Sequence, residues 1–403
     1  MKKFFGFLFL PKKSDRWLTI AVLALALLGV VMSASAAMGD ATIASDTLSR
    51  SLIVARRGAI FFAFSYVVML ICSRLPVFTL FTNQFSLLLG ALVILGLLLL
   101  PRILGISRGG SYAWIPIPLP LVSEVTIQPA EFAKIFIMLV VAGSVGGNQA
   151  NLKPFKLLRF PILCMVIYFF IIALVQKDFG TALVFASISY ATLLIPANPR
   201  LKRLQFWLKI AFFLVAALLV FICTPQGVAF VQSLGITSYQ IDRIIIPQNP
   251  FADRHAAGYQ LVYSLIAFSN GGWLGTGLGR SLQKFGYLPE SLTDFILAII
   301  AEELGLLGVL AVFILFGLII FRLLKYAFQV KNEKGKIILF GTAAYFFLHF
   351  LLNVGGITAL IPLTGVPLLL VSYGGSSTLA AMVAIAFCQR IIADDRKGKE
   401  DSS

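Results

Sequence analysis

Two carboxylates lie close together in the stretch 287–295, YLPESLTDF, where a long polar segment meets an apolar run. A carboxylate at a partly desolvated edge has a raised pKa, which suits it to take a proton from a hydroxyl group near neutral pH. Asp294 stands at the mouth of the apolar run and is the candidate general base. Glu290 is expected to support the loop or to contact a substrate.

A second set of charges opens another apolar run, in the stretch QPAEFAK at 128–134. Glu131 and Lys134 are three residues apart and therefore share one face of a helix. The preceding proline suits a first helical turn, where an acidic side chain also favours the positive end of the helix dipole. An ion pair that only anchors the helix end and a polar cavity are both open interpretations.

A third set occupies a short turn between two apolar runs, QKDFGT at 176–181. A solvated hairpin tip is one interpretation of Lys177 and Asp178. The alternative is functional, because ionisable residues that border membrane spans are costly in lipid and tend to face a bundle interior or water. On that interpretation Asp178 joins Asp294 and the 128–134 pair in one polar cavity.

The composition places these residues in a membrane protein. Of the 403 residues, 59% are hydrophobic and the mean hydropathy is +0.94, whereas soluble domains are about 45–50% apolar. A net charge of +16 would suggest nucleic acid as the partner of a soluble protein. Here the basic residues fall in short loops, so we expect membrane lipids and no nucleic acid. The four cysteines have neither CxxC nor Cys/His spacing, which argues against a disulfide framework and a zinc site.

Ten apolar runs are long enough to cross about 30 Å of hydrocarbon, which predicts an all-α polytopic protein with one membrane domain at 17–392. A basic segment, 1–16, and a tail, 393–403, flank it. The first run resembles a signal peptide, but at about 20 residues it is too long for one and is expected to be retained. The predicted spans are 17–37, 58–75, 84–101, 129–145, 158–175, 179–195, 206–223, 295–321, 337–353 and 368–389.

The distribution of Lys and Arg predicts the orientation. With an even number of spans both termini lie on one side, and the segments on that side carry 20 basic residues against 10 on the other. Because cytoplasmic loops are enriched in Lys and Arg, both termini are predicted to be cytoplasmic. Asp294 and the turn at 176–181 then face outward.

The segment 224–294 is the only long extramembrane loop. Its apolar and aromatic residues argue against disorder. Within 258–275, apolar residues recur at a helical spacing before a Gly-Gly stop, which predicts an interfacial or re-entrant helix. The run GTGLGR at 275–280 lacks the strand-turn-helix unit of a phosphate-binding loop. The segment 102–128, with three prolines, is expected to be irregular backbone on the membrane surface.

Eight short motifs, each weak alone, follow one another along the ten-span plan. They are QPAEFAK (128–134), KDFGT (177–181), GYQ (258–260), GTGLG (275–279), YLPESLTDF (287–295), AEELG (301–305), NVGG (353–356) and LIPLTGVPLLLVSYGGSS (360–377). With this set the chain resembles, from about residue 17 to residue 392, the SEDS family of bacterial shape, elongation, division and sporulation proteins, whose members include FtsW and RodA.

The resemblance implies a peptidoglycan glycosyltransferase that polymerises lipid II at the outer face of the cytoplasmic membrane. It also implies a class B penicillin-binding protein as partner, the transpeptidase that crosslinks the strands, and other divisome proteins. By position, Asp294 matches the family's catalytic aspartate, and Glu131, Lys134 and Asp178 match polar residues of its central cavity. Ser376, in the last motif, is expected in the same cavity. The residues of the later motifs, AEELG and PLTG to SYGGSS, favour the division type, FtsW-like, over the elongation type, RodA-like.

Two positions depart from the family pattern. Family members often have a histidine where Leu292 stands, so a histidine-assisted scheme is not available from that position. Many have a proline where Lys177 stands, and the lysine adds a cation near the expected site.

The implied chemistry is a single displacement in which Asp294 takes the proton of the acceptor hydroxyl and the anomeric centre is inverted. The leaving group is a polyprenyl pyrophosphate. Its developing negative charge requires fixed cations or a divalent metal ion, Mg²⁺ or Mn²⁺. The candidate cations on the outer side are Lys134, Lys177, Arg243 and Arg254.

A transporter of the lipid-linked precursor, a flippase, is the alternative from another functional class. Glu302 and Glu303 lie about 12–13 Å further along a helix than Asp294, and buried acids often mark translocation paths. However, the chain shows no internal repeat of the kind many transporters have, and its acidic and aromatic residues gather at the outer face. A scaffold that only recruits the transpeptidase would leave the outer charges unexplained.

Overall fold

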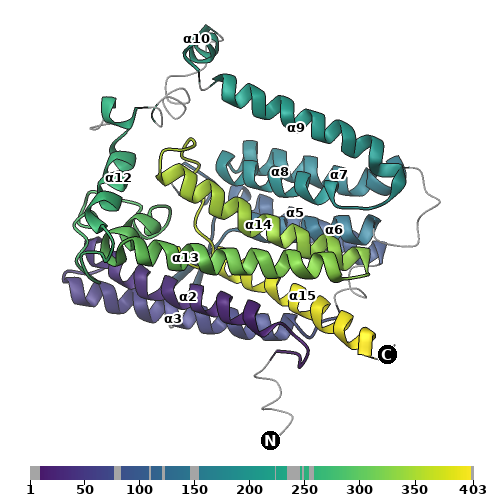
Figure 1. Ribbon diagram of the computed structural model, residues 1–403, viewed down its shortest axis with the longest axis horizontal. Coiled ribbons are helices and arrows are strands. Elements are labelled where there is room, and N and C mark those ends of the chain that lie inside the picture. Colours follow the sequence, from purple (N-terminus) through teal and green to yellow (C-terminus); the bar gives the residue numbers. More distant parts are fainter. Residues whose placement is uncertain are drawn as a thin grey trace, which may run out of the picture.

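The computed structural model describes most of the chain, and helices account for nearly all of its regular structure. The described residues are 10–76, 83–108, 110–119, 123–145, 154–222, 224–233, 246, 249–253 and 258–400. Figure 1 shows the long helices lying side by side in a bundle, with α12 at one end and the carboxyl terminus at the other.

Each predicted span coincides with one long helix. These are α2 (Arg16–Ala36), α3 (Thr47–Cys72), α5 (Gln84–Ile103), α6 (Pro129–Val145), α7 (Pro154–Phe170, continued by a π-helical turn, Ile171–Val175), α8 (Phe179–Leu194), α9 (Lys202–Ile222), α13 (Ile296–Gln329), α14 (Glu333–Ile357) and α15 (Gly375–Glu400). In the described part of the chain, seven helices are long and apolar enough to cross a membrane, namely α2, α3, α5, α7 with its π turn, α13, α14 and α15. The multi-span helical architecture is therefore confirmed, whereas a count of ten spans stays a prediction.

Three helices have bounds that hydropathy did not predict. Helix α3 begins at Thr47 and not at 58, because Asp46 caps it by accepting a hydrogen bond from the Ser49 amide at 3.0 Å. Helix α13 continues beyond its apolar run to Gln329. Helix α15 begins only at Gly375, since the preceding residues form turns in which Leu370 has a positive φ of 67°. It then extends into the predicted tail.

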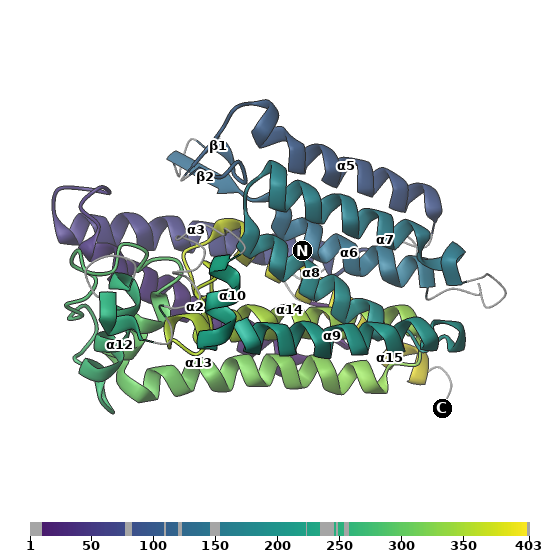
Figure 2. The same cartoon turned by 90° about the horizontal axis from the view of Figure 1, so that it is seen from above.

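The segment expected to be irregular contains a β-hairpin instead. Strands β1 (Ile115–Leu119) and β2 (Ser123–Ile127) pair antiparallel, with Ile115 opposite Ile127. Prolines at alternate positions of β1 are compatible with this ribbon, since only every second residue of an edge strand donates a hydrogen bond to its partner. Figure 2 shows the hairpin beside one end of α5.

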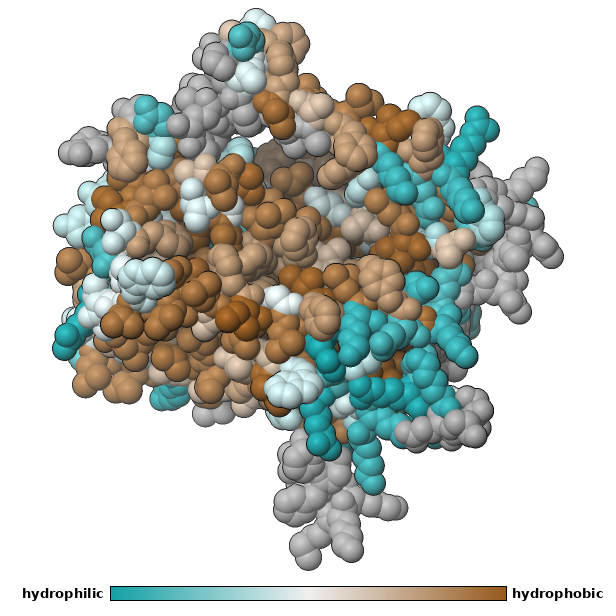
Figure 3. Space-filling model, viewed as in Figure 1, coloured by the Kyte–Doolittle hydropathy of each residue, from teal (hydrophilic) through white to brown (hydrophobic). Residues whose placement is uncertain are grey.

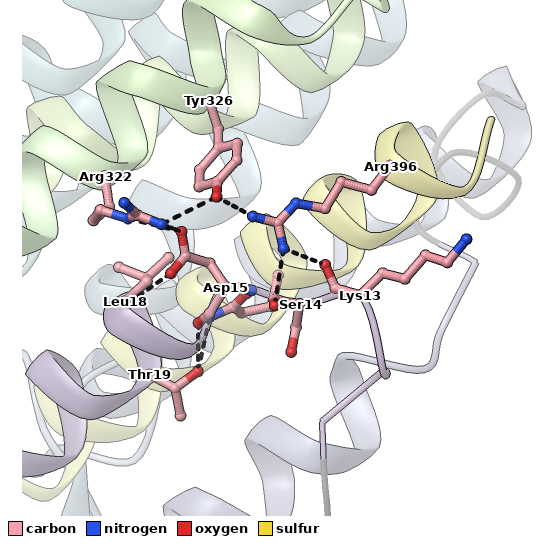
Figure 4. Close-up of polar contacts among 9 residues, drawn as sticks. Lys13, Ser14, Asp15, Leu18, Thr19, Arg322, Tyr326 and Arg396 are labelled. Atoms are coloured by element: carbon pink, nitrogen blue, oxygen red, sulfur yellow. Dashed lines mark hydrogen bonds and ion pairs between the residues drawn. The ribbon is translucent and has the colours of Figure 1, made fainter. Parts of the chain in front are cut away.

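The first described residues meet α13 and α15 in a polar cluster around the buried Asp15 (Figure 4). Arg322 of α13 donates to the Asp15 carboxylate at 2.8 Å. Gln389 of α15 exchanges two hydrogen bonds with the Asp15 backbone, at 2.7 and 2.9 Å. Arg396 donates to the Lys13 carbonyl at 2.9 Å. Figure 3 shows hydrophilic side chains gathered at the end of the bundle where this cluster lies and an apolar surface over the middle of the bundle, as expected for a membrane protein.

Helix α13 is broken at Gly305, and a loop replaces the hydrogen bonds lost there. Gly305 has φ 66° and ψ −163°. The carbonyls of Glu302 and Glu303, which an intact helix would pair with residues 306 and 307, instead accept from the amides of residues 276 and 277 at 2.9 and 3.0 Å. The amides of residues 306 and 307 donate to the carbonyls of residues 272 and 273. The segment 272–277 therefore completes the helix backbone within the bundle, where unpaired groups are costly.

This pairing explains the glycine-rich run that superficially resembles a phosphate-binding loop. Gly275 has φ +80°, and a Cβ placed on it would lie 2.1 Å from the Glu303 carbonyl oxygen. A glycine is needed here for close backbone contact with α13. The preceding helix, α12 (Tyr259–Gly271), confirms the helix predicted at 258–275.

The side chains of Glu302 and Glu303 are buried and hold the same loop. Glu303 pairs with Lys284 at 2.7 Å and accepts from the Ser35 hydroxyl of α2 at 2.6 Å. Glu302 accepts from the Asn270 amide group at 3.2 Å and from the hydroxyl of Ser281. Both acids are thus structural partners of the loop, which accounts for their burial without a translocation path.

We predict that Lys284→Met destabilises the fold by about 3–5 kcal/mol, because it leaves a buried carboxylate without its cation. The double variant Lys284→Met/Glu303→Gln removes both charges and should recover most of the loss. Thermal unfolding of the purified protein measures both. Arg390→Met, which breaks a partly exposed pair with Asp394, is the control and should cost less than about 1 kcal/mol. Equal stability of the single and double Lys284 variants would contradict the prediction.

Candidate functional site

Asp294 lies immediately before α13, at the end of the bundle opposite the termini. Three successive carbonyls of its segment accept hydrogen bonds from other parts of the chain. The Leu292 carbonyl accepts from the Tyr373 amide at 2.8 Å, and the Thr293 carbonyl accepts from the Ser372 hydroxyl at 2.6 Å. The Asp294 carbonyl accepts from the Asn353 side chain at 2.8 Å. The position of the carboxylate is therefore set by α14 and by the segment that precedes α15.

Asp294 is partly exposed as a residue, and its carboxyl group lies against the backbone of the PLTG segment, 362–365. A Cβ placed on Gly365, which has φ +67°, would be 3.5 Å from Asp294 Oδ2. Burial raises the pKa of Asp294 to about 7, with smaller contributions from the negative charges of Glu290 and Asp178. A carboxylate with this pKa changes protonation state near neutral pH, as a general base must.

Asp178 lies at the start of α8, which packs against the same PLTG segment. It caps α8 by accepting from the Thr181 amide at 3.0 Å, and its second oxygen accepts from the Gln128 side chain at 2.9 Å. A Cβ placed on Gly180 would lie 2.2 Å from the Thr364 carbonyl oxygen, so the start of α8 packs directly on the turn. Asp178 and Asp294 thus both lie near the backbone of residues 364–365, and their sharing of one polar cavity stays a prediction.

Glu131 and Lys134 form a buried ion pair, with Lys134 Nζ 2.7 Å from Glu131 Oε1 and both side chains 1% exposed. The hydroxyl of Tyr345 donates to the other oxygen of Glu131 at 3.0 Å. Lys134 Nζ also lies 3.1 Å from His349 Nε2. In this conformation the pair is enclosed by protein, and its role toward a substrate stays a prediction.

A cavity of about 310 Å³ opens beside the Asp294 segment, between α2, α3 and the residues before α15. Thr293 lines it, next to Asp294 in the chain, together with Trp114 and Tyr373. Two arginines, Arg57 and Arg108, also line the cavity. The cavity therefore has aromatic and cationic walls, and the residue next to Asp294 in the chain is part of its lining.

The other predicted site residues occupy more varied positions. Glu290 is exposed and accepts from the Thr293 hydroxyl at 2.9 Å. Lys177 is exposed with φ 58°, a backbone conformation that proline cannot adopt. Ser376 is buried, accepting from the Gln128 amide at 2.8 Å and donating to the Thr126 carbonyl at 2.9 Å, so it joins β2 to α15. Arg243 and Arg254 lie outside the described residues.

Two further residues of this region, His349 and Asn353, are not among those that the sequence patterns indicate, although Asn353 opens the NVGG motif. Both lie on the face of α14 that carries Tyr345, at the helical spacing i, i+4 and i+8. That spacing was the signal available in the sequence.

Metal binding finds little support from the side chains alone. Within the described residues no group of three or more His, Cys, Asp or Glu side chains is close enough to hold an ion. Asp294 and Asp178 would provide at most part of a coordination shell, since Mg²⁺ prefers six oxygen ligands.

Known proteins resemble this chain over nearly its whole length, which includes all eight motifs. The model of the FtsW, RodA and SpoVE family, described as "Cell cycle protein", matches residues 16–397. The chain is 33% identical over 380 residues to a probable peptidoglycan glycosyltransferase FtsW of Halothiobacillus neapolitanus, covering 94% of this chain and 86% of that protein. It is 31% identical over 372 residues to stage V sporulation protein E of Bacillus subtilis, covering 92% and 94%.

Solved structures have the same fold. One belongs to a study of how a peptidoglycan synthase complex coordinates polymerization and crosslinking, and matches with a TM-score of 0.67 and 22% identity over 95% of this chain and 98% of that one. The rod shape determining protein RodA of Thermus thermophilus matches with a TM-score of 0.63 and 22% identity, over 95% and 97%. The protein described here is therefore a multi-span membrane protein of the FtsW, RodA and SpoVE family.

Proposed function

We propose that the protein is a peptidoglycan glycosyltransferase that polymerises lipid II, with Asp294 as the general base. The observation that carries the proposal is a carboxylate with a pKa of about 7 whose chain neighbour, Thr293, lines a cavity with aromatic and cationic walls. The names of the curated relatives support the same activity.

The reaction joins a sugar hydroxyl of one lipid II to the anomeric carbon of another glycan chain. Asp294 takes the hydroxyl proton as the new glycosidic bond forms, and the bond to undecaprenyl pyrophosphate breaks with inversion. The partial exposure of Asp294 admits the acceptor, and the fixed carbonyls of residues 292–294 keep the carboxylate in place.

The departing pyrophosphate develops negative charge, which cations in a partly desolvated cavity stabilise. Arg57 and Arg108 line the cavity and are better placed for this role than Lys134, which is enclosed in its ion pair. A divalent ion, Mg²⁺ or Mn²⁺, would be held by Asp294 or Asp178 only together with phosphate oxygens of the substrate, and would add charge stabilisation.

The relatives and the charge distribution support a cellular setting for this activity. The relatives named FtsW support a division-type enzyme in the cytoplasmic membrane. The excess of basic residues at the end that bears the termini supports cytoplasmic termini and an outward-facing Asp294. The solved complex that coordinates polymerization and crosslinking supports a class B penicillin-binding protein as partner, with other divisome proteins.

The main argument for a flippase was that Glu302 and Glu303 lie deep in a span. Both side chains instead hold the loop against α13. Polymerisation and flipping assays on the same reconstituted protein separate the two activities.

We predict that Asp294→Asn abolishes polymer formation from purified lipid II in the presence of the partner, since loss of a general base costs about 10²–10⁴-fold. The variant should fold at least as well as the wild type at pH 8. The folded-state pKa of about 7 lies above the ordinary value, so ionising Asp294 destabilises the folded state as pH rises toward 7, and Asn avoids this cost. Undiminished polymerisation by a folded variant would remove Asp294 from the role.

The pH dependence of kcat/KM provides a second test. Activity should rise with pH through about 7 as Asp294 loses its proton. Asp178→Asn should lower this midpoint, because it removes a negative charge that raises the pKa of Asp294, while Asn still caps α8. Asp46→Asn makes the same change at the cap of α3 and should leave the midpoint unchanged. An unaltered midpoint in Asp178→Asn would contradict the assignment of the titrating group.

A further inference from the structure

Helix α14 carries a stripe of three buried polar side chains between the two charged clusters of the site. Tyr345, His349 and Asn353 are 0%, 0% and 3% exposed. Their spacing of four residues places them one above another on a single face of the helix. Buried polar groups in an apolar bundle are costly without hydrogen-bond partners, so the partners that these side chains have identify what the stripe connects.

The first two residues of the stripe contact the buried ion pair. Tyr345 donates to Glu131, and Lys134 lies 3.1 Å from His349 Nε2. His349 Nδ1 lies 3.1 Å from the Pro367 carbonyl, which can only accept a hydrogen bond. Nδ1 therefore carries the proton, and Nε2 accepts from the lysine ammonium group. One neutral imidazole thus joins the ion pair to the backbone that follows α14.

The third residue contacts Asp294 itself. Asn353 Nδ2 donates to the Asp294 carbonyl at 2.8 Å and to the Val366 carbonyl at 2.9 Å. A carboxamide has two N–H groups, so both are used to hold two segments far apart in sequence. His349 and Asn353 bind the consecutive carbonyls of Pro367 and Val366, directly after the glycine that packs on the Asp294 carboxylate.

We propose that this stripe is a positioning device, in which Asn353 fixes Asp294 and His349 couples the Glu131–Lys134 ion pair to the same turn. The inference rests on the proposed function for its kinetic consequences. On this proposal the buried ion pair helps to position the carboxylate. A shift of Lys134 would move His349, which would move the segment Val366–Pro367 and with it the Asp294 carboxylate. Among the described residues the Asn353 oxygen has no hydrogen-bond partner, so the side chain's contacts here are those two donations.

The first test compares Asn353→Leu, which is close in shape but lacks both donors, with Ser264→Ala as a matched control. Ser264 is also buried and donates to a carbonyl of α14, that of Ile357, at 3.0 Å. We expect Asn353→Leu to lower kcat on the order of 100-fold with little change in KM, as misplacement of a catalytic group does. Ser264→Ala should lose stability and keep its kcat. Asn353→Ala serves if the Leu variant does not fold.

Amide hydrogen exchange gives a readout that needs no activity. Peptides covering 290–296 and 366–374 should exchange at least about 10-fold faster in Asn353→Leu than in the wild type, and at the wild-type rate in Ser264→Ala. If the wild type fails to polymerise lipid II, the proposed function is wrong but the exchange result still tests the positioning. Asn353→Leu behaving like Ser264→Ala in both measurements would overturn the inference.

The coupling through His349 is tested by two variants that each keep one of its hydrogen bonds. Asn places a donor near Nδ1, toward Pro367, whereas Gln places an acceptor near Nε2, toward Lys134. We expect His349→Asn, which keeps the bond to Pro367, to retain slow amide exchange at 290–296. His349→Gln, which loses that bond, should show faster exchange there and a lower kcat. Equal exchange and equal kcat in the two variants would show that the link to Asp294 does not pass through Pro367.

Discussion

The cost of leaving a polar group unpaired away from water governs this structure more than any other constraint. Its clearest expression is the break in α13 at Gly305, where two lost helical hydrogen bonds are replaced by four bonds to the segment 272–277. A loop that follows a long extramembrane segment thereby becomes part of the bundle. The turns between that loop and Asp294 start from a fixed anchor, which limits where the carboxylate can lie.

The same constraint separates the acids of the bundle into two kinds. Glu131, Glu302 and Glu303 are each buried and satisfied by cations, hydroxyl groups or amides. Asp294 differs, because its neighbours include two other carboxylates, and its fixed contacts involve its backbone carbonyl. A carboxylate whose oxygens are paired with cations or hydrogen-bond donors stabilises the structure. A carboxylate that is fixed in position but has few such partners has a raised pKa and can accept a proton.

Much of this could be predicted from the sequence, because long apolar runs and turn residues act locally. The positions of the ten long helices and of the helix at 258–271 follow from such patterns. The same patterns indicate Asp294 as the candidate base. The prolines of 102–128 predict irregular backbone, because proline is rare in strands. The sequence does not show that 115–127 forms a two-stranded ribbon, in which prolines can occupy the positions that donate no hydrogen bond. The roles of Ser376, Glu303 and His349 depend on partners more than a hundred residues away or on backbone carbonyls, which no local pattern encodes.

The arrangement also bears on which motions the bundle can undergo. Alternating access requires one group of helices to move against another around a central site. Here α13 is bound to α2 through Glu303 and Ser35, and to the amino-terminal segment through Arg322 and Asp15. Moving α13 against α2 would break a buried ion-pair network near its first half and a second cluster near its last turns, without water to replace the lost partners. The contacts that hold α13 at both ends therefore argue against such a movement, and they keep the backbone next to Asp294 in place.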